Sequence, residues 1–176
     1  NMKTKIYSLG VAIFLLFCFA SGQTWHKYTF NSGNANNDVA AVNHGTVTGA
    51  VLTTDRFGNA NKAYDFGTTG TSKIDCGNIT IMNNTANLTI TGWFQKPVNT
   101  VIREMFCKPD AAGSIRARTY NDATQLYGYS GTQFTGAPTN ATNYTSIATG
   151  TWFHFALVIN TTTNSMKTDI NGVQYS

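Results

Sequence analysis

The acidic residues of this sequence are the first indication of whether the chain could perform hydrolytic chemistry. Glycoside hydrolysis needs two carboxyl groups beside the bond to be broken, about 5–5.5 Å apart in the retaining mechanism. Glu104 is the only glutamate, and no acidic residue lies two or four positions from it. We therefore interpret Glu104 as a solvated or salt-bridged strand residue, with Arg103 or Lys108 nearby. A catalytic pair could be built only from scattered aspartates.

The histidines and cysteines also lack a recognisable catalytic spacing. His26, His44 and His154 are far apart in sequence and are accompanied by no Gly-x-Ser-x-Gly elbow and no zinc-type Cys/His spacing. His154 lies in an apolar stretch, where a hydrogen-bonded core histidine is the usual explanation. Cys76 and Cys107 could form a disulfide in an oxidising compartment or remain buried thiols. No catalytic residue is predicted, and the chain is predicted not to be an enzyme.

One loop and the turn that follows it are rich in oxygen ligands. Carboxylate, amide and backbone oxygens suit Ca²⁺. The loop contains Asn36, Asn37 and Asp38 and continues to Asn43, while Asp55 lies on the next turn. Asp38, Asn43 and Asp55 are therefore the candidate metal ligands. The alternative is that these Asn and Asp side chains only stabilise turns.

A second group of residues could form a sugar-binding surface. Such a surface needs flat aromatic faces beside planar polar groups. Alternation along residues 114–120 places Arg116, Arg118 and Tyr120 on one face, and Tyr127 and Tyr129 follow on the next predicted strand. These five residues are the predicted ligand-binding set. The alternative is that the tyrosines only reflect strand propensity and that the arginines keep an open face soluble.

The N-terminus resembles an export signal. Lys3 and Lys5 precede an apolar run over residues 6–19, and small residues follow at 20–22. The run is shorter than the about 20 residues that a membrane span needs. We predict a signal peptide over residues 1–22, a secreted or cell-surface protein, and no membrane span in the mature chain. Without Lys3 and Lys5 the chain has ten basic and eight acidic residues. This small excess does not favour a nucleic-acid partner.

The rest of the chain is typical of an all-β protein. Apolar residues recur with period two, and turn residues interrupt them about every ten positions. The clearest strand is 87–95, and Asn171-Gly172 is the strongest hairpin turn. Residues 152–159 are apolar on both faces, which predicts a central strand buried on both sides, so Trp93 and Trp152 are assigned to the core. Other strands are predicted at 25–30, 49–52, 63–66, 72–76, 101–107, 114–120, 125–129, 144–147, 166–170 and 173–175.

Three segments resemble the laminin-G-like, concanavalin-A-like jelly-roll group in its bacterial secreted form. Residues 55–64 (DRFGNANKAY) resemble its first turn, and residues 87–94 (NLTITGWF) resemble its T-I-x-x-W core strand. Residues 151–156 (TWFHFA) with 169–172 (DING) resemble its W-x-H-x-A and N-G hairpin. The resemblance covers about 28–175. The laminarinase-type enzymes share this fold, but their Glu-x-Asp-x-x-Glu motif is absent.

The resemblance implies an antiparallel two-sheet β-sandwich, a jelly roll, over residues 23–176. The family often holds one calcium ion near its N-terminal loop, and usually has further strands after the N-G turn, so we expect the sequence to be truncated at its C-terminus. It implies a non-catalytic module that binds an extracellular glycan, within a larger extracellular protein. The alternatives are an adhesion module for cell-surface proteins and, less favoured, a jelly-roll glycoside hydrolase.

Overall fold

The computed structural model describes most of the chain after the predicted leader, which lies outside the described residues. Within the described part the regular structure consists of strands in antiparallel pairs and one short 3₁₀ turn, η1 (Thr80–Met82). No helix there is long and apolar enough to cross a membrane. The all-β prediction is thus confirmed. The described residues are 25–68, 70–82, 87–96, 103–109, 115–120, 125–130, 140–143, 147–160, 162–163 and 165–175.

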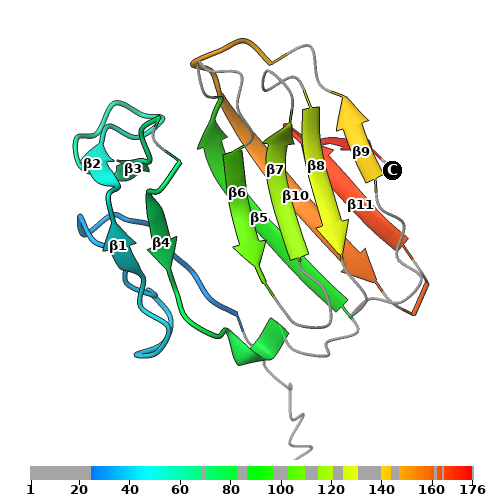
Figure 1. Ribbon diagram of the computed structural model, residues 1–176, viewed down its shortest axis with the longest axis horizontal. Coiled ribbons are helices and arrows are strands. Elements are labelled where there is room, and N and C mark those ends of the chain that lie inside the picture. Colours follow the sequence, from blue (N-terminus) through cyan, green and yellow to red (C-terminus); the bar gives the residue numbers. More distant parts are fainter. Residues whose placement is uncertain are drawn as a thin grey trace, which may run out of the picture.

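Two four-stranded antiparallel sheets make up the larger part of the fold. The first sheet has the order β12-β11-β10-β5, and the second has the order β6-β7-β8-β9. Figure 1 shows β6, β7 and β8 crossing in front of β5, β10 and β11. The first sheet comprises β5 (Asn87–Gln95), β10 (Trp152–Asn160), β11 (Ser165–Ile170) and β12 (Val173–Tyr175). The second comprises β6 (Arg103–Lys108), β7 (Ile115–Tyr120), β8 (Gln125–Ser130) and β9 (Asn140–Asn143).

Two small sheets precede these in the chain. β1 (Thr46–Thr48) pairs with β4 (Lys73–Asp75), and β2 (Val51–Thr53) pairs with β3 (Ala63–Asp65). They lie beside the β5 and β6 edge of the large sheets in Figure 1. Each strand is only three residues long, so side-chain contacts and loop hydrogen bonds must supply much of the order of this region.

The two large sheets share one apolar core. Phe153, Phe155 and Leu157 alternate along β10, and each is almost completely buried. Ile115 and Ala117 of β7 belong to the same buried cluster, although they come from the other sheet. The two sets of side chains pack against each other and so remove apolar surface from water. This burial stabilises the fold by about 25 cal/mol for each Å² of apolar surface. This shared cluster holds the sheets face to face.

The outer face of the first sheet is more open than the sequence predicts. β10 lies between β11 and β5, so its central position is confirmed. However, Val158 is 38% exposed and Trp93 of β5 is 46% exposed. The prediction that β10 is buried on both faces and the assignment of Trp93 to the core were wrong. The reason is that only the inner face of this sheet packs against the second sheet, and an antiparallel sheet can leave its other face to solvent.

Most strand predictions agree with the structure, and the difference at residues 25–30 has a clear cause. Residues 25–30 form no strand, because their backbone bonds to a neighbouring loop: Lys27 N donates to Asn37 Oδ1 and Thr29 N to Asp38 Oδ2. Sequence alternation did not predict β1 or β9. Residues 144–146 of the strand expected at 144–147 lie outside the described residues. The predicted hairpin is confirmed, with positive φ at Asn171 and Gly172.

Candidate functional site

The predicted ligand-binding residues lie on adjacent strands of the second sheet. The register pairs Arg116 with Tyr129 and Arg118 with Tyr127 across β7 and β8. Directly opposite residues of an antiparallel pair share one face. Ile115 and Ala117 are buried in the core on the other face of β7, so Arg116 lies on the face that points away from the core.

The fifth predicted residue, Tyr120, is paired with Gln125 at the end of β7. The backbone therefore brings the five residues into one strand pair. The side chains of Arg118, Tyr120, Tyr127 and Tyr129 lie outside the described part of the structure. Their role as a ligand surface stays a prediction.

Glu104 of β6 forms an ion pair with Arg116 of this strand pair. Its Oε1 accepts a hydrogen bond from Arg116 Nη1 at 2.8 Å, and both side chains are partly exposed. In the strand register Glu104 is also opposite Arg118. The interpretation of Glu104 as a salt-bridged strand residue is confirmed, but this partner lies on the neighbouring strand rather than nearby in sequence.

Asp38, a candidate metal ligand, is tied to the segment before it. Its Oδ2 accepts hydrogen bonds from Thr29 Oγ1 at 2.6 Å and from Thr29 N at 2.8 Å. Both bonds favour the charged carboxylate and lower the pKa of Asp38 below its ordinary value. The bond from the Thr29 hydroxyl has the larger effect, and the bond from the Thr29 backbone N–H the next.

A pH prediction follows from this pair. A depressed folded-state pKa adds stability above the unfolded pKa, and that stability is lost as the pH falls through the folded pKa. Thr29→Val removes the hydroxyl donor but keeps the backbone donor, so we expect the pKa of Asp38 to rise toward its ordinary value. Carboxyl ¹³C NMR titration measures this, with Thr48→Val on exposed β1 as control. An unchanged Asp38 titration in Thr29→Val would contradict the assignment.

Asp55 and Asn43, the other metal candidates, also stabilise local structure. Asp55 Oδ1 accepts from the backbone N–H groups of Phe57 and Asn59, both at 2.9 Å. Asn43 Nδ2 donates to the carbonyls of Cys76 and Asn78. Among the residues that the structure describes, no group of three or more His, Cys, Asp or Glu could hold a metal ion. The turn-stabilising alternative accounts for these contacts, and calcium binding stays a prediction.

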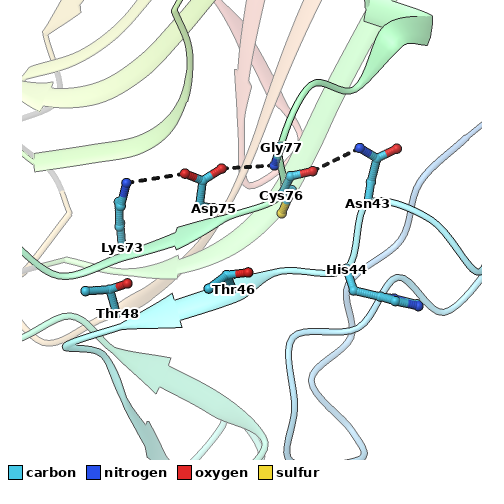
Figure 2. A pocket seen from close by; sticks show the side chains of 8 residues that line it. All are labelled: Asn43, His44, Thr46, Thr48, Lys73, Asp75, Cys76 and Gly77. Carbon is cyan, nitrogen blue, oxygen red and sulfur yellow. Dashed lines mark hydrogen bonds and ion pairs between the residues drawn. The ribbon is translucent and has the colours of Figure 1, made fainter.

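A shallow groove of about 520 Å³ lies over the β1–β4 pair (Figure 2). The register places Thr46 opposite Asp75 and Thr48 opposite Lys73, so one face of the pair is polar throughout. Figure 2 shows Lys73 and Asp75 pointing toward each other, whereas His44 points away from them. The lining residues are Asn43, His44, Thr46, Thr48, Lys73, Asp75, Cys76 and Gly77.

The groove offers hydrogen-bonding groups rather than a nucleophile. Asp75 accepts from Gly77 N at 2.9 Å and pairs with Lys73 at 3.3 Å, and these contacts lower its pKa. Burial, joined by the nearby Asp75 charge, raises the pKa of the Cys76 thiol despite a hydrogen bond with Tyr28. The thiol is therefore protonated near neutral pH. Cys76 and Cys107 are not joined by a disulfide in this structure.

An exposed cluster of planar groups, which the sequence did not predict, lies on the outer face of the first sheet. The Cζ atom of Arg56 lies 3.9 Å from the centroid of the Phe57 ring and 4.3 Å from that of Trp93. His154 makes an edge contact with Trp93, at 5.4 Å between ring centroids. We call Arg56, Phe57 and Trp93 the Arg56 cluster.

His154 supports the cluster from β10. Its Nε2 lies 2.6 Å from Thr91 Oγ1, a hydrogen-bond distance. The histidine is therefore hydrogen-bonded, as the sequence indicated, but it lies on the outer face of the sheet and not in the core. The sequence pattern of β5 did indicate the outward position of Trp93, because alternation places Trp93 on the same face as the polar residues Thr89 and Thr91.

Comparisons of the chain with protein-family models, curated proteins and solved structures find no match. The structure defines the class as an all-β protein built from antiparallel sheets.

Proposed function

We propose that this protein is an exported, non-catalytic module that binds glycans through the outer face of β7 and β8. The observation that carries the proposal is the strand register, which sets Arg116 opposite Tyr129 and Arg118 opposite Tyr127. Alternating guanidinium groups and phenol rings suit a saccharide. The rings stack on the apolar C–H faces of a pyranose, while the guanidinium groups bond to its hydroxyl groups.

The fold supports a jelly roll of the laminin-G-like kind. Two four-stranded antiparallel sheets share a single apolar cluster, with Phe155 from one sheet and Ile115 from the other. A sandwich needs such inner faces and leaves its outer faces for ligands. The signal peptide that the sequence predicts over residues 1–22 supports export, to the extracellular space or the cell surface.

The chemistry of the described residues supports a binding role over hydrolysis. The only glutamate is paired with Arg116, so its carboxylate is held in a charge-assisted hydrogen bond. Retaining hydrolysis would require a second carboxyl group about 5–5.5 Å away. Of the described acidic residues, Asp75 is the nearest before Glu104 in sequence and Asp169 the nearest after it, and both accept hydrogen bonds from the backbone of turns.

A glycan array followed by titration tests the proposal. For any glycan that the wild type binds, we expect Arg118→Ala and Tyr127→Ala each to weaken affinity about tenfold or more, since each loses a charge-assisted bond or a stacking contact. Lys73→Gln is the matched control, because it removes a positive charge from the separate β1–β4 groove. Unchanged affinity in both β7–β8 variants would refute this face, and binding only to protein ligands would refute the glycan proposal.

A further inference from the structure

The Arg56 guanidinium is stacked on rings but keeps its N–H edge open. Its five N–H donors form no hydrogen bond with the residues that the structure describes. The neighbouring carboxylate, Asp55, is already used by the backbone of Phe57 and by Asn59. Stacking between a guanidinium and an aromatic ring leaves the planar edge of the guanidinium available for an oxyanion.

The turn that carries Arg56 is held in place before any ligand arrives. Asp55 Oδ1 and Oδ2 accept three hydrogen bonds from Phe57 and Asn59, and Gly58 supplies the left-handed conformation at φ 88°. The amide of Lys62 donates to Thr53 O at the base of the same hairpin. A preorganised site loses less conformational freedom when a ligand binds.

The cluster also exposes apolar surface beside this cation. Phe57 is 71% exposed and Trp93 is 46% exposed. Such rings can cover the C–H face of a sugar, while the adjacent guanidinium bonds in a bidentate manner to a carboxylate. The one acidic residue of this face on β11, Asp169, has its Oδ1 occupied by the amide of Gly172.

We infer that the Arg56 cluster is a second ligand site, which binds the carboxylate of an acidic saccharide, a hexuronate residue of a polymer. Arg56 holds the carboxylate, and Phe57 and the exposed part of Trp93 contact the sugar ring. This site lies on the outer face of the first sheet and uses none of the residues of the β7–β8 face. It therefore extends the proposed function but can be tested independently of it.

The experiment compares an acid with its neutral ester on the same sugar backbone. Isothermal titration at low salt uses an oligogalacturonate and its fully methyl-esterified form. We expect the wild type to bind the acid at least about tenfold more tightly than the ester, because the ester has no charge for the guanidinium to pair with. Arg56→Gln should remove this preference. Arg56→Lys, which keeps the charge but loses the planar fork, should recover only part of it.

Lys167→Gln is the matched control, because Lys167 is an exposed cation of the same sheet face and is paired in register with Val158. Equal loss in Lys167→Gln and Arg56→Gln would overturn the inference in favour of a general charge effect. Equal affinity of the wild type for acid and ester would also overturn it, as would an unchanged preference for the acid in Arg56→Gln. Polyglutamate binding as tight as oligogalacturonate binding would show an acidic-peptide site instead. Arg118→Ala should leave the acid preference unchanged, which separates this site from the β7–β8 face.

Discussion

Phe155→Ala is expected to lower the free energy of unfolding by about 3–5 kcal/mol, because truncation of a buried aromatic side chain loses its burial and leaves a cavity. Phe155 is 1% exposed in the middle of β10, where the register places it opposite Gly92 of β5 and Ile170 of β11. Its cluster also includes Ile115 of the other sheet. Urea denaturation followed by circular dichroism measures the change.

The matched control is Val158→Ala on the same strand. Val158 points to the outer face and is 38% exposed, so its truncation should cost less than about 1 kcal/mol. Hydrogen exchange supplies a second measurement, since the shared core predicts that Phe155→Ala also reduces amide protection in β7. Similar costs for the two variants, or unchanged protection in β7, would contradict the face-to-face packing of the sheets.

The strands could be predicted because their evidence is local. Side chains alternate across a strand with period two, so Leu88, Ile90 and Phe94 identified the inner face of β5 from sequence alone. The Asn171-Gly172 turn was equally readable, because both of its positions need positive φ and these residue types tolerate it. The positions of most strands followed from such patterns, whereas their order in the sheets did not.

Burial of the second face of a strand could not be predicted in the same way. The apolar outer positions of β10 suggested cover on both sides, yet exposure depends on whether another layer of the fold packs there. Trp93 illustrates the limit, since its place in a strand expected to be buried favoured the core, while strand alternation placed it on the face of Thr89 and Thr91. Here the alternation was the better guide.

Contacts between distant segments account for the rest of the candidate sites. The Arg56 cluster joins a turn to β5, and nothing near Arg56 in sequence indicates that it meets Trp93. The register that sets Arg118 opposite Tyr127 depends on how β7 and β8 pair, which the sequence pattern alone left open. Sequence identified the residue types, and tertiary structure determined which of them meet.

Asn37 in the oxygen-rich loop is another residue whose contacts the sequence did not predict. Its side chain is buried and contacts several polar groups of the loop. It is 5% exposed, and its Oδ1 accepts from the amides of Lys27 and Val39. Its Nδ2 donates to the carbonyl of Val42 and lies 2.7 Å from His26 Nδ1. One side chain thus satisfies polar groups from both sides of the loop, which has no strand pairing to do so.

Asn37→Ala is therefore expected to destabilise this region by about 2–4 kcal/mol, because several buried groups lose their partners together. Asn37→Asp tests the donor alone, since it keeps the shape but turns a carboxylate oxygen toward the carbonyl of Val42. We expect it to be destabilising as well at neutral pH. Asn36→Ala is the control, because the neighbouring Asn36 is exposed and, among the described residues, bonds only through its backbone N–H, to Asn34 Oδ1.

Hydrogen exchange is the appropriate measurement, because this region could open without unfolding the two large sheets. The amides to follow are Asp38, which donates to Lys27 O, and Gly45, which donates to Ala35 O. Both should lose protection in Asn37→Ala while the β10 amides keep theirs. Equal protection in Asn37→Ala and Asn36→Ala would mean that the loop is held by its backbone contacts rather than by Asn37. Loss of protection in β10 as well would mean that the loop and the sheets unfold as one cooperative unit.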